Sequence, residues 1–395
     1  MPDATGPLAG IRVVDFSVGF AVPGAAMYLA DQGADVIKVE APNSTRVGRN
    51  GTYLVYNRGK RAISLDLRSP DGMAVAHDLV RRADVMMATS PPGELDRRGL
   101  GYAAMSALNS RLIYASITGW GNNGPDRMKR GADYVVQAYS GIMASQPSSD
   151  GTPSGTAWYP ADMSIPMYLP YAIMLALWQR ETTGVGQHVE TTQLQAQLAM
   201  QMIHLVHNEQ GEPLDDQVAG TSIAWSWRRP AHTYQASDGK WIALVGLNND
   251  EWRRLWGILE LGEFPSDPRI TGIWWPPDLI EAHFEQIQAR IRTRGRDEWV
   301  AILEANDFGP VISPVLTREE VMVSPQVVAN GWALEQQHPT AGKIRMLGTP
   351  FSLSGSPVPK PEPAPEPGQH TDDILRELGH SADAIAALRA KGAVR

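Results

Sequence analysis

Short runs of branched apolar residues recur along the first 120 positions, separated by segments with helical spacing. These runs are rich in Val, Ile and Leu, so they are predicted to be strands: 11–16, 35–40, 62–67, 85–88 and 112–118. Helices are predicted over 23–31 and 70–82, the second with Ser69 as its N-cap. Several runs are apolar on both faces, as in a parallel sheet covered by helices. The pattern therefore predicts a doubly wound α/β domain.

The pattern changes after residue 160. A continuous apolar run predicts a buried core helix over 167–179, and a Met- and Gln-rich stretch predicts another over 189–208. The elements predicted further along are a strand pair and a helix within 232–262, helices over 281–292 and 298–306, an extended Pro-rich segment over 354–368, and one or two helices over 371–391. The region from about 225 to 325 is therefore expected to be a smaller α+β domain.

One carboxylate stands alone at the start of the apolar run. After Asp162, no charged residue occurs before Arg180. An ionised carboxylate in apolar surroundings must accept hydrogen bonds or remain reactive. Asp162 could cap the helix, with Pro166 in its first turn, or it could be a catalytic group. Spacing alone favours the cap.

Composition limits the classes of function. The chain has 395 residues, enough for about two domains, with 43% hydrophobic and 20% charged residues. Its net charge is −8 and it has no Lys/Arg-rich stripe, so nucleic acid is not an expected partner. It has no cysteine, which excludes disulfides, thiolate zinc sites and a cysteine nucleophile.

No targeting or membrane segment is expected. The first ten residues have no basic residue and no apolar core, unlike a secretory signal. The apolar run of residues 163–179 is interrupted by Pro166 and Pro170 and falls short of the roughly 20 residues that a membrane span needs. We therefore expect a cytoplasmic protein.

Cofactor and metal motifs are absent or out of context. Residues 99–104 formally match G-x-G-x-x-A, but they follow Asp96-Arg97-Arg98 rather than a strand. The chain has no Walker A sequence and no G-x-S-x-G elbow. His204 and His207 have no third ligand at metal-binding spacing. We expect no metal and no permanently bound cofactor.

Basic residues gather at three predicted chain breaks. They are Arg58, Lys60 and Arg61 before a strand, Arg97 and Arg98 before a glycine turn, and Lys129 and Arg130 before Gly131. Most Lys and Arg are simply solvated. Three such groups beside strand or helix ends would nevertheless suit a phosphate-bearing ligand.

A series of ordered segments carries a resemblance over nearly the whole chain. The segments are PLAGIRVVDF (7–16), GADVIKVE (33–40), NRGKR (57–61), LDRRGLGY (95–102), GADYVVQAYSG (131–141), ADM (161–163), TGVGQHV (183–189), SPQV (324–327) and PGQHT (367–371). In these segments the chain resembles the class III CoA-transferases, the family of formyl-CoA transferase, carnitine CoA-transferase and α-methylacyl-CoA racemase. Each segment is weak alone, and their common order makes the resemblance strong.

The resemblance implies a large domain built from both chain ends, a small domain, and two chains interlocked as a homodimer. Accordingly, residues 1–205 would form the large α/β CoA-binding domain, 225–325 the small α+β domain, and 330–395 the return to the large domain. It would also explain long linkers near 205–225 and 325–370, which a compact monomer hardly needs.

The resemblance also implies site residues and substrates. Asp162 matches the nucleophilic aspartate, which would attack an acyl-CoA donor, form a mixed anhydride and then an aspartyl-CoA thioester, and pass CoA to a carboxylic acid acceptor. The other matches are Phe20 and Ala21 in the loop facing the CoA thiol, Lys60, Arg61, Arg97 and Arg130 as basic CoA contacts, and Gly246 and Asn248 in an active-site loop.

Departures from the family pattern bear on the choice of reaction. Racemases use a histidine in Gly-His-Asp, which here reads Gly131-Ala132-Asp133, and their small-domain glutamate aligns near Asn248 or Asn249. Without these bases, CoA transfer to a carboxylate is favoured. A racemase or epimerase with an unidentified second base, and a catalytically silent CoA-thioester binding protein, stay as alternatives. The role of Asp133 stays open.

The acyl group cannot be identified from the sequence. Ser164, Ile165 and Pro166 replace small residues that often follow the aspartate, which should reshape the acyl pocket. Trp158, Tyr159, Trp225 and Trp227 hint at a bulky apolar or aromatic acyl group, although aromatic residues are equally common in cores.

Overall fold

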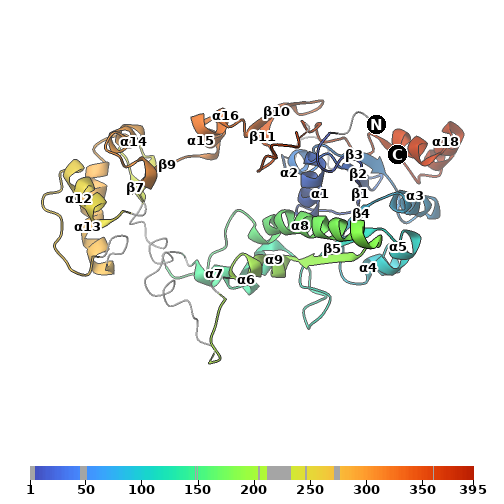
Figure 1. The fold of residues 1–395 in the computed structure, drawn as a ribbon, viewed down its shortest axis with the longest axis horizontal. Coiled ribbons are helices and arrows are strands. Elements are labelled where there is room, and N and C mark those ends of the chain that lie inside the picture. Colours follow the sequence, from blue (N-terminus) through green and yellow to red (C-terminus); the bar gives the residue numbers. More distant parts are fainter. Residues whose placement is uncertain are drawn as a thin grey trace. The chain divides into compact units, whose positions relative to one another are not determined.

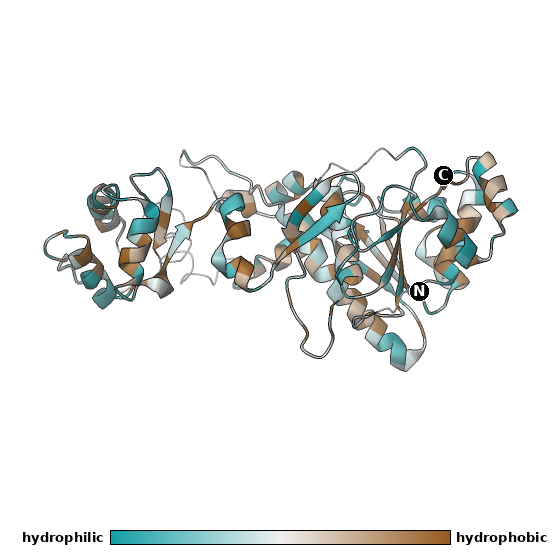
Figure 2. Ribbon diagram, turned by 90° about the horizontal axis from the view of Figure 1, so that it is seen from above, coloured by the Kyte–Doolittle hydropathy of each residue, from teal (hydrophilic) through white to brown (hydrophobic). Residues whose placement is uncertain are grey.

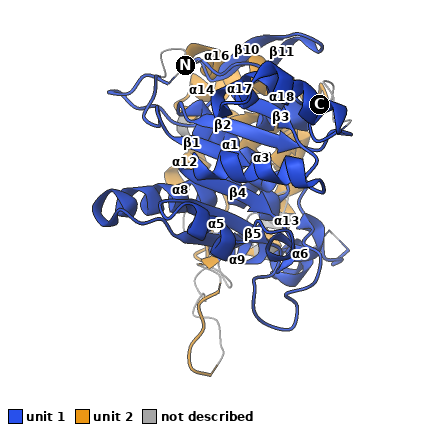
Figure 3. Cartoon of the chain, turned by 90° about the vertical axis from the view of Figure 1, so that its right-hand side faces the viewer, with its two compact units in different colours: residues 1–201, 331–395 blue, residues 202–330 orange. Residues whose placement is uncertain are grey.

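The computed structural model describes residues 5–44, 51–146, 148, 150–202, 205–210, 233–244, 247–270, 276–358 and 360–395. The chain divides into two compact units, coloured separately in Figure 3. Unit 1 combines residues 1–201 with 331–395, and unit 2 consists of residues 202–330. Unit 1 is thus made from both ends of the chain.

Unit 1 is organised around a six-stranded sheet in the order β3-β2-β1-β4-β5-β6. Its strands are β1 (Arg12–Asp15), β2 (Asp35–Glu40), β3 (Arg61–Ser64), β4 (Val85–Thr89), β5 (Ile113–Thr118) and β6 (His188–Thr192). Every neighbouring pair is parallel, which confirms the predicted parallel α/β sheet. The hydrophobic strands are brown in Figure 2. The strand order reverses between β1 and β4, where doubly wound sheets bind ligands.

Helices cover both faces of this sheet. One apolar cluster joins the sheet to α1 (Ala21–Asp31) and α8 (Pro160–Thr183). The helices on the other face are α3 (Pro70–Arg81), α5 (Tyr102–Leu108), α17 (Thr371–Leu378) and α18 (Ala382–Ala390). Leu65 and Val394 form an antiparallel bridge, and the C-terminal helices are red in Figure 1. The last residues of the chain therefore complete the core of its first domain.

The prediction of one helix over 189–208 is wrong. His188–Thr192 form β6, which pairs with β5, and α9 (Gln193–Ala199) begins only afterwards. The strand contains β-branched Val189, Thr191 and Thr192, which favour extended backbone. Thr192 then caps α9 by accepting a hydrogen bond from the Gln195 N–H at 2.8 Å.

The helix predicted over 167–179 is longer than expected and only half buried. α8 runs from Pro160 to Thr183 and continues through Pro166 and Pro170. Ile165, Leu169 and Ile173 pack into the sheet core. A second stripe is 40% to 77% exposed and consists of Met167, Tyr171, Met174, Leu175 and Trp178. Their spacing of three and four residues places them on one face.

Unit 1 contains further short helices that the sequence pattern did not predict. They are α2 (Gly51–Tyr56), α4 (Glu94–Arg97), α6 (Asp133–Tyr139) and α7 (Ile142–Ser145). Two of them matter for the site, because α4 follows β4 directly and α6 begins at Asp133.

The stretch expected as a linker over 325–370 begins with folded elements. It contains α16 (Pro325–Ala329) and an antiparallel hairpin of β10 (Ala333–His338) and β11 (Gly342–Leu347). Its described residues from 348 to 370 form no helix or strand, which agrees with the extended Pro-rich segment predicted over 354–368. The buried Arg58 guanidinium pairs with Asp31 of α1 at 2.7 Å and donates to the Leu347 carbonyl at 3.0 Å. This pairing fastens the hairpin to α1, within unit 1.

Unit 2 has its own core. Its elements are an antiparallel sheet of β7 (Thr233–Gln235), β8 (Trp241–Leu244) and β9 (Ile312–Val315), with α12 (Asn249–Ile258), α13 (Pro277–Ile291), α14 (Arg296–Glu304), the 3-10 turn Gly309–Val311 and α15 (Arg318–Val323). Trp252, Trp256 and Trp299 are buried among them. The predicted strand pair and three helices are confirmed here.

Candidate active site

Asp162 lies in the first turn of α8, but it does not cap the helix. The helix begins at Pro160, and its N-cap is Tyr159, which makes no side-chain cap hydrogen bond. The cap interpretation is therefore wrong, because the helix starts two residues before Asp162. Tyr159 has φ 56°, a left-handed conformation uncommon for a residue other than glycine. Such conformations often occur at functional sites.

Two neighbouring residues determine the chemistry of the Asp162 carboxylate. Gln193 Nε2 donates to Asp162 Oδ1 at 2.6 Å. The backbone N–H of Asp162 donates to Asp133 Oδ2 at 2.9 Å. Burial raises the pKa of Asp162, the Gln193 hydrogen bond opposes the shift, and the nearby Asp133 charge adds to it. The result is a carboxylate more basic than an ordinary aspartate.

Asp133 ties the start of α6 to the start of α8. It is buried, and Gln137 Nε2 donates to its Oδ1 while Gln137 Oε1 accepts from the Thr156 N–H at 2.8 Å. Asp133 therefore holds the Asp162 backbone and brings a second negative charge close to the site. The sequence had left its role open.

Two glycines leave room for the Gln193 amide. A Cβ on Gly131 would lie 2.3 Å from Gln193 Oε1 and 2.8 Å from the Cα of Gly119. The Leu194 N–H also donates to the Gly119 carbonyl at 3.1 Å. Larger residues at either glycine would displace the backbone or the amide. These close contacts fix the amide beside Asp162.

The first turns of α8 also pack closely against α1 and α2. A Cβ on Gly24 would lie 2.9 Å from Pro166 Cγ and 3.5 Å from the Tyr56 ring. The Tyr56 hydroxyl donates to Met163 Sδ at 3.2 Å. Burial raises the pKa of Tyr56, and the charge of Asp162 adds to this shift. Tyr56 is therefore within electrostatic reach of the Asp162 carboxylate.

Phe20 and Ala21 lie directly after β1, at the carboxyl edge of the sheet. Phe20 is the N-cap of α1 and is 42% exposed, whereas Ala21 is buried as the first helical residue. β1 and β4 are the neighbours between which the strand order reverses. The Phe20 loop therefore borders the crevice where a doubly wound sheet binds its ligand.

Lys60 does not reach this surface, contrary to the expected CoA contact. Its ammonium is fully buried and donates to Asp15 Oδ2 at 2.9 Å, to the Pro23 carbonyl at 3.0 Å and to Asn57 Oδ1 at 3.1 Å. An ammonium has three hydrogens, so none is left for a ligand. Burial lowers the pKa of Lys60 to about 8, while Asp15 opposes this shift. Lys60 instead holds the beginning of α1.

Asp15 is the centre of this buried cluster. Besides Lys60, it contacts Lys38 Nζ at 3.5 Å and accepts from the backbone N–H of Ser17 at 2.9 Å. Lys38 also donates to the Ser17 carbonyl. Although burial opposes it, the two ammonium groups and the hydrogen bonds from the Ser17 hydroxyl and Lys60 hold the pKa of Asp15 well below its usual range. The cluster fixes the loop that leads from β1 to Phe20.

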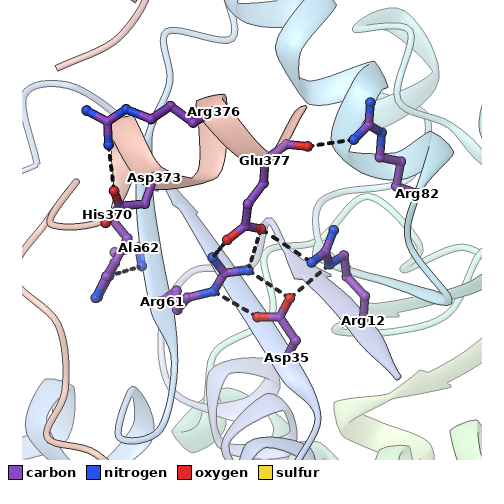
Figure 4. Close-up of polar contacts among 9 residues, drawn as sticks. All are labelled: Arg12, Asp35, Arg61, Ala62, Arg82, His370, Asp373, Arg376 and Glu377. Atoms are coloured by element: carbon purple, nitrogen blue, oxygen red, sulfur yellow. Dashed lines mark hydrogen bonds and ion pairs between the residues drawn. The ribbon is translucent and has the colours of Figure 1, made fainter. Parts of the chain in front are cut away.

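Arg61 is occupied at the opposite edge of the sheet. Its guanidinium donates to Asp35 at 2.9 and 2.8 Å and pairs with Glu377 of α17 at 2.6 Å, and Arg12 binds the same two carboxylates (Figure 4). Arg12, Asp35 and Arg61 each begin a strand, so this cluster lies at the amino edge. The geometry therefore gives Arg61 a structural role and does not bring it to the Phe20 loop.

Arg97 and Arg130 have more exposed side chains. Arg97 ends α4, just after β4, and pairs with Glu94 at 2.5 Å while its side chain stays 65% exposed. Arg130 is exposed beside Gly131, and its carbonyl accepts from Trp120 Nε1 at 3.3 Å. Within the described part of the chain, the Arg130 guanidinium has no partner. Both residues could contact a phosphate.

The remaining predicted residues belong to unit 2. Asn248 caps α12 in a capping box with Glu251, where its side chain accepts from two backbone N–H groups at 2.9 Å. Gly246, Trp225 and Trp227 lie outside the described residues.

Metal-binding clusters and membrane-spanning helices are absent from the residues that the structure describes. No group of three or more His, Cys, Asp or Glu side chains there could hold a metal ion. Likewise, none of the helices in the described ranges has the length and apolarity to cross a bilayer.

Sequence reasoning missed Gln193, Gln137 and Tyr56. Gln193 was placed inside a helix that begins four residues too early, which concealed its position at the end of a strand. Gly119 and Gly131 gave the one available signal, since two glycines near a strand end suggest a close backbone approach. Nothing in the sequence connects either glycine with Gln193.

Comparison with known proteins places this geometry in a family. Residues 8–371 match the model of CoA-transferase family III. Succinate–glutarate CoA-transferase of Agrobacterium fabrum is 33% identical, over 96% of this chain and 97% of that protein. Succinyl-CoA:glutarate CoA-transferase of Homo sapiens is 31% identical, over 98% of this chain and 90% of that protein. These relatives support the prediction of an enzyme that acts in acyl-CoA metabolism.

Solved structures agree in fold. A CaiB/BaiF family protein from Brucella suis has a TM-score of 0.82 and 28% identity, covering 95% of this chain and 100% of that one. A hypothetical protein from Mycobacterium tuberculosis has a TM-score of 0.76 and 26% identity, covering 94% and 99%. The chain belongs to CoA-transferase family III, as its ordered sequence segments predicted.

Proposed function

We propose that this enzyme transfers CoA from an acyl-CoA to a carboxylic acid, with Asp162 as the nucleophile. The observation that carries the proposal is the environment of Asp162. Its carboxylate is partly buried, accepts a hydrogen bond from a neutral amide, and lies near a second carboxylate. Within the described residues it has no cationic partner. Such a carboxylate is basic enough to attack and sheltered enough to protect a reactive ester.

The reaction proceeds in four steps with Asp162 restored at the end. Asp162 attacks the thioester carbonyl, the C–S bond breaks, and CoA leaves as a thiolate, giving a mixed anhydride. The thiolate then attacks the aspartyl carbonyl and expels the donor's carboxylate, giving an aspartyl-CoA thioester. The acceptor carboxylate attacks this thioester and releases the thiolate. Finally, the thiolate attacks the acceptor's acyl carbon and frees Asp162.

CoA is a substrate in this proposal, and no resident cofactor is needed. Its thiol end lies at the Phe20–Ala21 loop, where the N-terminus of α1 carries no acidic residue in its first turn. Arg97 and Arg130 contact its phosphates from the carboxyl edge of the sheet. Lys60 acts indirectly, through the buried cluster that fixes this loop.

A racemase is disfavoured by the residues that stand where racemases carry their proton-transfer groups. Ala132, the N-cap of α6, stands where racemases carry a histidine and cannot transfer a proton. Asn248 is no base, and its side-chain oxygen accepts two cap hydrogen bonds. Proton exchange at the α-carbon needs an acid and a base on opposite faces, and the described residues offer no second base beside Asp162 other than the bonded Asp133.

The relatives suggest where to search for substrates. Their names include succinate, glutarate, formyl-CoA and oxalate. Short dicarboxylates and their CoA thioesters are therefore the first substrates to test, followed by bulkier aromatic acids.

We further propose that the functional unit is a homodimer and that the exposed stripe of α8 lies against the second copy. Met167, Tyr171 and Trp178 are each at least 64% exposed in the single chain. Contiguous apolar surface of this kind usually marks an interface. Light scattering should give the mass of two chains, and Trp178→Glu should reduce it towards one. A cytoplasmic location stays a prediction.

Mass spectrometry tests the proposed mechanism directly. The protein is mixed with acyl-CoA thioesters and quenched, and its peptides are analysed with and without hydroxylamine. An adduct at Asp162 that depends on acyl-CoA supports the transferase. Exchange of the α-proton in heavy water without any adduct would favour the racemase. CoA binding with neither signal would favour a silent binding protein.

A further inference from the structure

The Gln193 side chain is held in place by burial and by close backbone contacts, in addition to its hydrogen bond with Asp162. Gln193 is the first residue of α9 and only 8% exposed. Its amide lies against the close contact of Gly119 and Gly131, and its neighbour Thr192 caps the helix. The amide therefore has a fixed position relative to Asp162 before any substrate binds.

The hydrogen bond distinguishes the two oxygens of Asp162. An ionised carboxylate only accepts hydrogen bonds, so the NH₂ of Gln193 faces Oδ1. Asp133 accepts from the Asp162 backbone and does not occupy the carboxylate. Oδ2 is thus the oxygen left to attack an acyl carbon, and Oδ1 becomes the carbonyl oxygen of the aspartyl ester.

We propose that the Gln193 amide is the oxyanion donor for attack on the aspartyl carbonyl, an assignment that rests on Asp162 being the nucleophile. When CoA thiolate attacks Cγ of the anhydride, the C=O electrons move to Oδ1 and Gln193 Nε2 donates to the resulting oxyanion. Collapse restores C=O and breaks the bond from Cγ to Oδ2, which leaves with the donor's carboxylate. The same donor serves when the acceptor carboxylate attacks Cγ of the thioester and expels thiolate.

The geometry suits this role without rearrangement. An oxyanion donor works at about 2.7–3.1 Å from the oxygen, and Nε2 already lies 2.6 Å from Oδ1. Oδ1 stays bonded to Cγ throughout both attacks, so the donor follows it with little motion. In the first and last steps the attacked carbon belongs to the acyl group. Gln193 therefore serves the two middle steps and not the outer two.

The test compares Gln193→Met with Gln195→Met. Methionine keeps the length of the side chain but removes the donor. Gln195 is exposed on the same helix and contributes only a backbone cap hydrogen bond. Each variant and the wild type are mixed with acyl-CoA at alkaline pH, where Asp162 is ionised with or without the hydrogen bond. Intact mass separates the acyl adduct from the CoA adduct, and released CoA is counted over time.

We expect Gln193→Met to retain the first release of CoA and to accumulate the acyl adduct. Its CoA adduct and turnover should fall about 10²–10³-fold, the usual effect of losing one oxyanion donor. Gln195→Met should resemble the wild type. If Gln193→Met loses both adducts in equal proportion, or turns over as Gln195→Met does, the assignment is wrong.

Two further outcomes are decisive. If the wild type forms no adduct at Asp162, the proposed function fails and this assignment fails with it. If Gln193→Met shows a reduced melting temperature, Gln193→Asn takes its place, because the shorter amide keeps polarity but cannot reach Oδ1. Normal formation of the CoA adduct by folded Gln193→Asn overturns the oxyanion role.

Discussion

Asp15 and Asp162 both lie in unit 1, the first fully buried and the second partly buried, and their surroundings are opposite. Asp15 contacts two lysine ammonium groups, and its pKa is held well below the usual range. Asp162 has a neutral amide and a neighbouring carboxylate, and its pKa is raised. Paired charges make the first carboxylate unreactive and structural. The second has no cation beside it within the described residues, which suits the nucleophilic role proposed for it.

Position in the sequence is also a poor guide to which basic residues can reach CoA. Lys60 and Arg61 are adjacent, and both were expected to bind CoA. Lys60 is fully buried at Asp15, and Arg61 is tied to Asp35 and Glu377 at the other edge. Arg97 and Arg130, which no buried carboxylate among the described residues engages, remain on the surface.

Replacing Asp162 should give the largest functional loss. Asp162→Asn removes the nucleophile, so turnover should fall by about 10³-fold or more. Its melting temperature should not fall, because the raised pKa shows that the folded protein disfavours the charged form. Steady-state kinetics and calorimetry measure the two effects. A fully active Asp162→Asn would show that Asp162 is not the nucleophile.

Replacing Asp15 should instead destabilise the fold. Asp15→Asn leaves two buried ammonium groups without their counter-charge, which costs about 3–5 kcal/mol. Because the folded pKa of Asp15 is depressed, its contribution is present above the unfolded pKa and is lost as pH falls towards the folded value. Urea unfolding near neutral and acidic pH tests this. Asp78→Asn, at an exposed surface pair, is the control and should change little.

The pH dependence of activity should show whether Asp162 is the carboxylate that attacks the thioester. Asp162 must be ionised to attack, and its pKa is raised. As the pH is lowered, activity should therefore be lost at a higher pH than an ordinary aspartate would give. Asp133→Asn removes a charge that raises this pKa and should move the acid limb to lower pH. Gln193→Met should move it to higher pH. Profiles of kcat/KM in the three proteins measure the shifts, and an unchanged limb in both variants would contradict the assignment.

Loss of Arg97 should change the KM for acyl-CoA, whereas loss of Arg61 should change the stability of the fold. Arg97→Ala should raise the KM for acyl-CoA several-fold and leave stability unchanged, because among the described residues the exposed Arg97 guanidinium pairs only with the neighbouring Glu94. Arg61→Ala should lower stability by about 1 kcal/mol with an unchanged KM, because exposed and partly exposed ion pairs contribute little. Equal KM values in the two variants would mean that Arg97 does not contact CoA.

The repeating layers of unit 1 were predictable because burial on both faces leaves continuous apolar runs. Val13, Ile37 and Ile113 are all inaccessible to solvent, and each belongs to such a run. The predicted position of Asp162 rested on family resemblance, since its spacing favoured a cap. Its helix starts at a left-handed Tyr159, and no residue preference signals that conformation.

The hydrogen-bonding partners of the site could not be predicted. Asp133, Asp162 and Gln193 belong to three elements and meet only after β6 has paired with β5. The β-branched run before Gln193 is compatible with a strand or a helical pattern, and its tertiary partner decides between them. In the same way, burial of Lys60 depends on Asp15, 45 positions earlier.

The closing of the sheet's second face by α17 and α18 has a consequence for biosynthesis. Glu377 of α17 engages Arg12 and Arg61, and Val394, which follows α18, forms a bridge with Leu65. A ribosome makes the strands before the helices that cover them, so the nascent domain keeps an apolar face uncovered until α17 and α18 have been synthesised. Such exposed surface favours aggregation and binding by chaperones. Termination of translation before α17 would therefore yield an insoluble product rather than a slightly shorter enzyme.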